Sequence, residues 1–197
     1  MPCHERARRR TQLVGRDGEL DRIAAAWARA RSGPRQLVIV EGEAGMGKTT
    51  LALEAARRLH QEGGTVIYRR CDRQLLRPYQ PFAEPVARYV AVCPADQLTR
   101  ELAWAPDDVA RLAPEVGARL GVQPAPPETD PEASRHRMFA AVGSFFTAMA
   151  RDAPTVTVLD DLQWADEATV LLLRYVLRTL EAVPLLFVAL HRPEELV

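Results

Sequence analysis

One stretch decides the fold of this chain: Gly42-Glu43-Ala44-Gly45-Met46-Gly47-Lys48-Thr49. It matches the pattern G-x-x-x-x-G-K-[ST], in which a glycine-rich backbone wraps phosphates, the lysine reaches the outer phosphates and the hydroxyl ligates Mg²⁺. A short apolar run at residues 37–40 precedes it, and a helical pattern over residues 50–60 follows. A helix that begins at such a loop points free N–H groups at an anion. The sequence therefore predicts a nucleotide-phosphate site here.

The lysine content supports this interpretation. Among 26 basic residues Lys48 is the only lysine, and the other 25 are arginines. The planar guanidinium is a poor substitute for a compact ammonium inside a phosphate loop. A composition that avoids lysine thus keeps one where the loop chemistry needs it.

The chain as a whole has the composition of an ordinary globular domain. Its 197 residues are 47% apolar and 26% charged, enough for one domain with a substantial core. The formal net charge is zero and only 6% of residues are aromatic. This segment therefore offers neither the basic surface nor the stacking platform of a nucleic-acid-binding domain.

The cysteine pattern and the hydropathy of the chain indicate the cellular compartment of the protein. Cys3, Cys71 and Cys93 form neither a C-x-x-C motif nor a disulfide framework, which favours a reducing cytoplasm. The basic N-terminus is not followed by the apolar segment of a signal peptide. The longest apolar run, residues 183–190, is too short to cross a bilayer. We expect a cytoplasmic protein without membrane contact.

Periodicity predicts alternating helices and strands. A helix with Asp17 as N-cap buries Leu20, Ile23, Ala24 and Trp27. Further helices are expected over 50–60, over 131–151 and after Asp166, and strands over 37–41, 65–70, 155–161 and 183–190. The unbroken apolar run at 37–41 is typical of a parallel strand buried on both faces.

Residues 72–130 carry a weaker signal, which we interpret as a helical insertion. Prolines at 78, 81 and 85 interrupt its start, a short helix is expected near 82–90 and a single helix over 107–120. A proline-rich loop follows over 121–131. The insertion is too short to be a domain of its own. We therefore expect a flexible arm over residues 1–12 and one α/β domain over 13–197.

A second motif follows the strand at 155–161, which ends in Asp160 and Asp161. Paired with a phosphate loop, Asp160 is expected to hold Mg²⁺, directly or through water, and Asp161 to polarise a water aimed at the terminal phosphate. The alternative is that both carboxylates only cap the chain from Leu162 onward.

His191 and Arg192 follow the last predicted strand, at the rim where open α/β sheets bind ligands. Arg192 could reach a phosphate there, or pair with Glu194 or Glu195 as an ordinary surface ion pair. His191 is expected to have a structural role.

Four blocks in this order carry a family resemblance: residues 13–16, 42–49, 158–166 and 189–195. Together they resemble the AAA-type ATPase module of the signal-transduction (STAND) NTPases, and most closely that of the large ATP-binding LuxR-type bacterial transcriptional regulators. The resemblance covers roughly residues 11–197 and is weakest between 98 and 130.

The resemblance implies a three-layer P-loop NTPase sandwich of AAA/ASCE type, with a mostly parallel sheet. It implies ATP or ADP and Mg²⁺ as ligands, with Lys48, Asp161 and Arg192 in catalysis and Thr49 and Asp160 at the metal. Arg192 would read the γ-phosphate. The residues expected to contact nucleotide are Val14, Gly15, Arg16, Gly42, Glu43, Ala44, Gly45, Met46, Gly47, Lys48, Thr49 and Thr50.

The sequence departs from the family pattern at two points. Many AAA-type ATPases have Asp-Glu where this chain has Asp160-Asp161, and the shorter side chain favours a slow switch over fast turnover. A fifth strand and a helical lid are also expected after the last predicted strand, beyond residue 197.

The expected function is an ATP-binding, weakly hydrolysing switch domain of a bacterial regulator. Its expected partners are the other domains of that regulator or further copies of the chain. Two alternatives stay open: a turnover ATPase of motor type, and a non-catalytic fragment that acts as an interaction module.

Overall fold

The computed structural model describes residues 15–72, 78–102, 106–123 and 130–193. The arm at 1–12, Val14 of the expected nucleotide contacts, and Glu194 and Glu195 lie outside the described residues.

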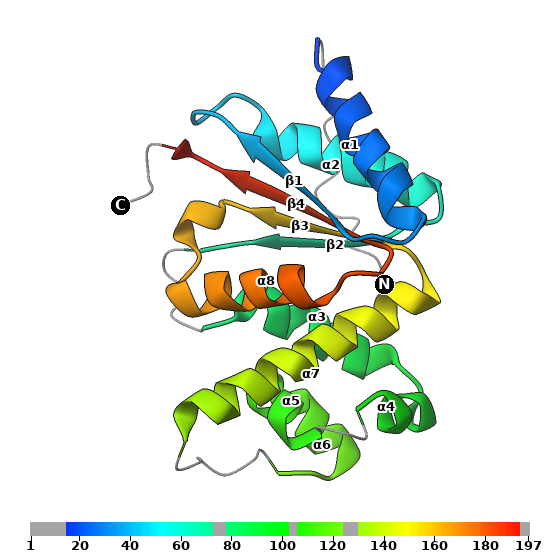
Figure 1. Cartoon of the computed structure of the whole chain (residues 1–197), viewed down its shortest axis with the longest axis vertical. Helices are drawn as coiled ribbons and strands as arrows, with labels where there is room; N and C mark the ends of the chain where they lie inside the picture. Colours follow the sequence, from blue (N-terminus) through cyan, green and yellow to red (C-terminus); the bar gives the residue numbers. More distant parts are fainter. Residues whose placement is uncertain (1–14, 73–77, 103–105, 124–129, 194–197) are drawn as a thin grey trace.

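The described chain forms a three-layer α/β sandwich around a four-stranded parallel sheet (Figure 1). The strands are β1 (Gln36–Glu41), β2 (Thr65–Arg70), β3 (Thr155–Asp160) and β4 (Leu185–His191). They lie in the order β1-β4-β3-β2, and all pairings are parallel. The four carboxyl ends therefore open on one edge of the sheet. This confirms the predicted P-loop NTPase sandwich.

Two helices cover one face of the sheet, α1 (Asp17–Arg31) and α2 (Lys48–Gln61) (Figure 1). Their apolar stripes bury Trp27 and Leu59 against Val158 and Val188 of the central strands. The opposite face is covered by α3 (Gln80–Val92), α7 (Pro131–Asp152) and α8 (Glu167–Thr179). Each layer buries its own apolar cluster, so the sheet is held from both sides.

The insertion is helical as predicted, but its helices differ in number and position. α3 contains Pro81 in its first turn, where no N–H is needed, and Pro85 in its interior. α4 (Ala95–Leu102) was not predicted. The prediction of a single helix over 107–120 is wrong. Two helices cover this range, α5 (Pro106–Leu112) and α6 (Pro114–Leu120), because Pro114 forces Ala113 into an extended conformation.

The start of α1 differs in detail from the prediction. Asp17 is the first helical residue rather than the N-cap; Arg16 occupies the cap position and makes no side-chain cap hydrogen bond. Ala24 is exposed, while Ala26 and Ala30 complete the buried stripe. Asp166 does cap α8 as predicted, since its side chain accepts a 2.8 Å hydrogen bond from the Thr169 N–H.

β1 is not the fully buried strand that its apolar run predicts. It lies at one edge of the described sheet and alternates between covered and exposed side chains. Val38 and Val40 pack toward the α1–α2 cluster, whereas Leu37 and Ile39 are 42% and 54% exposed. Composition alone cannot show that one face of this strand lacks a covering helix in the described chain.

Among the described residues, no helix combines the length and the apolar character that a membrane crossing requires.

The turn between α2 and β2 provides a test of the α1–α2 packing. A Cβ at Gly64 would lie 2.8 Å from Trp27 Cζ2 and 2.9 Å from the Leu59 carbonyl oxygen. We expect Gly64→Ala to destabilise the chain by about 1–3 kcal/mol, measured by urea unfolding, because a buried indole and a backbone atom must both move.

Gly18→Ala is the matched control. Its Cβ would point into open space within α1, so stability should stay equal or rise by up to about 1 kcal/mol. Equal unfolding midpoints for Gly64→Ala and the unchanged chain would contradict the packing described.

Candidate phosphate and metal site

The sequence-predicted site residues that the structure describes meet at the carboxyl edge of the sheet. The glycine-rich loop follows β1, Asp160 ends β3 and Arg192 follows β4. These strands are neighbours or next neighbours in one parallel sheet (Figure 1). Their following segments therefore converge, although the residues are far apart in sequence.

The loop geometry depends on glycine at two positions. Gly45 and Gly47 have φ angles of +81° and +79°, a region that side chains with a Cβ rarely adopt. Gly47 is the N-cap of α2, so the loop leads straight into the helix N-terminus. The Lys48 ammonium donates to the carbonyl oxygens of Gly42 at 2.6 Å and Glu43 at 2.8 Å. The cation thus lies against the loop itself.

The loop and β3 are joined by one direct contact. The Thr49 hydroxyl donates a 2.9 Å hydrogen bond to Asp160 Oδ2. The same oxygen accepts a 2.6 Å hydrogen bond from the Tyr68 hydroxyl, and Asp160 Oδ1 accepts from the Asp161 N–H at 2.9 Å. Asp160 is only 3% exposed. Burial, and then its hydrogen bond to Asp160, raise the pKa of Tyr68, which stays a donor at neutral pH.

Thr49 and Asp160 together fit a magnesium ion. A hydroxyl and a carboxylate oxygen are hard donors, and Mg²⁺ typically takes one or two carboxylates and completes its shell with water and phosphate oxygens. The described residues contain no cluster of three or more His, Cys, Asp or Glu side chains that could form an all-protein metal cage. The pair therefore suits a cation that arrives with a phosphate ligand.

Asp161 lies deeper than its predicted role requires. It is 6% exposed and has a positive φ of 53°. Its Oδ2 accepts from Arg70 at 2.7 Å, and its Oδ1 accepts from Gln163 at 3.1 Å and from Arg192 at 3.4 Å. Its side chain makes no cap hydrogen bond to the short helix after it, η1 (Leu162–Trp164). Its oxygens are thus engaged by the neighbouring side chains.

Arg192 makes further contacts besides its ion pair with Asp161. Its backbone N–H donates to Gln163 Oε1 at 3.3 Å, and its guanidinium carbon lies 5.5 Å from the centre of the Trp164 ring. His191, next to it, forms a 2.8 Å contact with Glu41 at the end of β1. The guanidinium therefore lies at the same edge as the loop.

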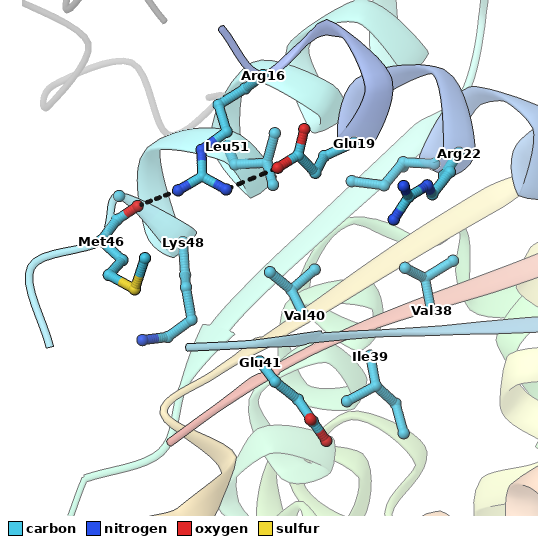
Figure 2. A pocket seen from close by; sticks show the side chains of 12 residues that line it. Arg16, Glu19, Arg22, Val38, Ile39, Val40, Glu41, Met46, Lys48 and Leu51 are labelled. Carbon is cyan, nitrogen blue, oxygen red and sulfur yellow. Dashed lines mark hydrogen bonds and ion pairs between the residues drawn. The ribbon is translucent and has the colours of Figure 1, made fainter. Parts of the chain in front are cut away.

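A pocket of about 270 Å³ lies between α1, β1 and the loop. Figure 2 shows Arg16 at its rim, donating to the Met46 carbonyl oxygen at 3.1 Å and to Glu19 at 2.6 Å. The Arg16 hydrogen bond holds the pKa of Glu19 below its usual range. Val38 and Val40 project into the same space from β1. Of the residues expected on the purine side, Arg16 thus contacts the glycine-rich loop. Gly15, which precedes Arg16 in the chain, has a φ angle of +74°.

The sequence did not predict two residues of the site, Tyr68 and Arg70. Both lie on β2, which carries no recognisable motif. Alternation along a strand places them on one face, and the register sets Arg70 opposite Asp160. The sequence could show the alternation, but not that β2 would be the neighbour of β3.

Comparison with known proteins identifies a family and several similar proteins, among them one relative and one solved structure. Residues 12–188 match a family model described as an AAA ATPase domain. An uncharacterized protein of Rhizobium meliloti (strain 1021) is 28% identical over 196 residues, and the match covers 92% of this chain and 18% of that protein. This chain therefore spans less than a fifth of the length of that relative.

One similar solved structure is the ORC2 protein of Aeropyrum pernix, solved as ADPNP and ADP complexes. It aligns with a TM-score of 0.50 and 14% identity, over 92% of this chain and 42% of that one. At this identity the likeness concerns the fold.

Cys71, directly after β2, provides a pH-dependent test of the packing beside Asp160. Its N–H donates to the Asp160 carbonyl oxygen at 2.9 Å, and burial raises the pKa of its thiol to about 12. Iodoacetamide reacts with the thiolate, and an unfolded cysteine has a pKa of about 8.5. At pH 8 we expect Cys71 of the native chain to be alkylated at least about a hundredfold more slowly than in urea.

The native rate should rise steeply between pH 8.5 and the folded-state pKa of about 12, whereas the rate in urea levels off. Over the same window folding stability should fall, because the unfolded thiol loses its proton first. Equal rates for native and unfolded Cys71, followed by mass spectrometry of its peptide, would refute this.

Proposed function

Because the chain belongs to the AAA ATPase domain family, we propose that it is an ATP-binding, slowly hydrolysing switch domain of a bacterial signal-transduction or transcriptional regulator. The observation that supports this most is the 2.9 Å contact between Thr49 and Asp160. It brings the hydroxyl of the phosphate loop and the carboxylate of β3 to one point, where a nucleotide-bound Mg²⁺ would need them.

In this proposal the loop binds ATP through its backbone and Lys48. The N–H groups at the start of α2 face the phosphates, and the Lys48 ammonium turns from the carbonyl oxygens of Gly42 and Glu43 to the β- and γ-phosphate oxygens. Thr49 and Asp160 hold the metal, which when bound neutralises charge on the phosphates. Gly15, Arg16 and Val14 border the purine, and the Arg16 contact with Met46 ties α1 to the loop.

Slow hydrolysis is favoured by the contacts of Asp161. A general base needs a free lone pair within reach of a water, but both carboxylate oxygens already accept hydrogen bonds from Arg70, Gln163 and Arg192. The hydrogen bond to the Asp161 carboxylate raises the pKa of Arg70, which agrees with a close ion pair between the two side chains. Turnover requires this cluster to open, which favours a switch over a motor.

Arg192 would act as the γ-phosphate reader. It is shared between Asp161 and the Trp164 ring, and the phosphate oxygens of ATP would compete with the carboxylate for the same guanidinium. Occupancy of the loop would thereby alter the position of the Arg192 side chain after β4. In a switch domain this is the change that neighbouring domains read.

Two observations support the proposed regulatory role: the order of the motifs along the chain, and the greater length of the relative. The match in Rhizobium meliloti covers only 18% of that protein, which leaves room for further domains there. Leu37 and Ile39 are exposed on β1 and support contact with another part of the parent protein. A cytoplasmic location belongs to the same proposal, because Cys71 and Cys93 are free thiols.

Replacing the loop lysine tests nucleotide binding. Lys48→Ala removes the ammonium that would contact the outer phosphates, and we expect Mg·ATP affinity to fall about tenfold to a hundredfold by calorimetry, equivalent to roughly 1.5–3 kcal/mol. Arg58→Ala is the matched control on the same helix, since it loses only a surface pair with Glu54. Undiminished affinity in Lys48→Ala would remove the loop from the proposal.

The ion pairs of Asp161 make a second, separate prediction. Arg70→Gln should raise steady-state phosphate release about two- to fivefold, because a partly exposed ion pair is worth roughly 0.4–1 kcal/mol and its loss frees one carboxylate oxygen.

Arg69→Gln serves as the control for Arg70→Gln, because Arg69 pairs with Glu84 and alternation along β2 directs neighbouring side chains to opposite faces of the sheet. Asp161→Asn added to Arg70→Gln should abolish the gain. A lower or unchanged rate in Arg70→Gln would show that the ion pair does not restrain Asp161.

A further inference from the structure

Tyr68 is the described side chain that most tightly constrains the metal-site carboxylate without belonging to any motif. Its hydroxyl donates to Asp160 Oδ2 at 2.6 Å. Its ring is half-buried and packs against the α1–α2 cluster. The phenol therefore reaches Asp160 from a side chain that is packed against the core.

Strand pairing explains why this contact forms. In the register of β2 and β3, Tyr68 lies opposite Val158 and Arg70 lies opposite Asp160. Tyr68 therefore reaches the carboxylate diagonally, across one two-residue step of the parallel pair, a span that an aromatic side chain can cover. A shorter hydroxyl side chain at position 68 would not cover it.

The three donors around Asp160 hold it in one orientation. Oδ2 accepts from Tyr68 and Thr49, and Oδ1 accepts from the Asp161 N–H. The terminal torsion of an aspartate is otherwise broad and nearly two-fold. Removing the Tyr68 hydroxyl leaves one donor on each oxygen, so the carboxylate can turn about that torsion.

We propose that Tyr68 is a positioning residue for the divalent cation: it holds Asp160 in the orientation in which Oδ2 faces the Thr49 hydroxyl, and so favours Mg²⁺ over larger cations. The inference rests on the proposed nucleotide site and deepens it. Mg²⁺ demands near-ideal octahedral geometry with short metal–oxygen distances, whereas Ca²⁺ accepts irregular shells. A carboxylate held in one orientation therefore favours Mg²⁺ over Ca²⁺, and a carboxylate that can rotate discriminates less between the two cations.

The test is ADP binding by calorimetry in EDTA, in Mg²⁺ and in Ca²⁺, with the purified chain and its Tyr68→Phe variant. Phenylalanine keeps the half-buried ring and removes only the hydroxyl. We expect Tyr68→Phe to leave affinity in EDTA unchanged and to reduce the Mg²⁺-dependent gain about three- to tenfold, the net worth of one ordinary hydrogen bond, because Tyr68 acts on the cation only through Asp160. The Ca²⁺-dependent gain should change by less than about twofold.

Two controls separate positioning from a general loss of packing. Tyr89→Phe removes another hydroxyl, one that accepts from Gln97 in the helical insertion, and should leave all three affinities unchanged. Tyr68→Phe combined with Asp160→Asn should lose no more of the Mg²⁺-dependent gain than Asp160→Asn alone, because Tyr68 acts through that carboxylate. The affinities in EDTA, Mg²⁺ and Ca²⁺ are compared on the same protein sample, so their ratios do not depend on the fraction of that sample that is folded.

An unchanged Mg²⁺-to-EDTA ratio in Tyr68→Phe, with ADP bound by the unaltered chain, would overturn the role of Tyr68 and leave the nucleotide site standing. Equal losses in Mg²⁺ and Ca²⁺, or additive losses in the double variant, would overturn it as well. If the unaltered chain binds no ADP under any condition, the proposed function and this inference fall together.

Discussion

The hydrogen bond from Thr49 to Asp160 joins two residues that are 111 positions apart, and the rest of the site is arranged around it. It forms because β1 and β3 run parallel with only β4 between them, so the segments after both strands open on one edge. The hydroxyl of α2 thereby meets the carboxylate of β3. An antiparallel pairing of the same strands would place these groups at opposite ends of the sheet.

β2 supports this contact although it carries no motif. Tyr68 fixes the carboxylate of Asp160, and Arg70 pairs with the carboxylate of Asp161. The ion pair of Arg70 is partly exposed and contributes little to stability, but Asp161 is nearly buried and would be costly to leave unpaired. The same contacts that satisfy the buried acids also restrain them, and this restraint is the reason for proposing a switch rather than a fast enzyme.

The expectations that failed have two different physical causes. The apolar run of β1 predicts a buried strand. Leu37 and Ile39 are nevertheless exposed, because no described residues cover the face of β1 on which they lie. The periodic pattern over 107–120 reads as one helix, yet Pro114 divides it through a steric effect on Ala113. In contrast, α2 and α7 agree with their predicted ranges to within a few residues, because their apolar faces repeat at the helical period.

The sequence by itself determined the local parts of this protein: the glycine-dependent loop before α2, the cap at Asp166, the apolar stripe of α7 and the acidic end of β3. Each depends on residues that are neighbours along the chain, so spacing is enough to predict it. Only the tertiary structure decided that Tyr68 holds Asp160 and that Asp161 is bound by Arg70 and Arg192. Those contacts depend on which strands pair and in what register, and long-range pairing leaves no mark in local periodicity.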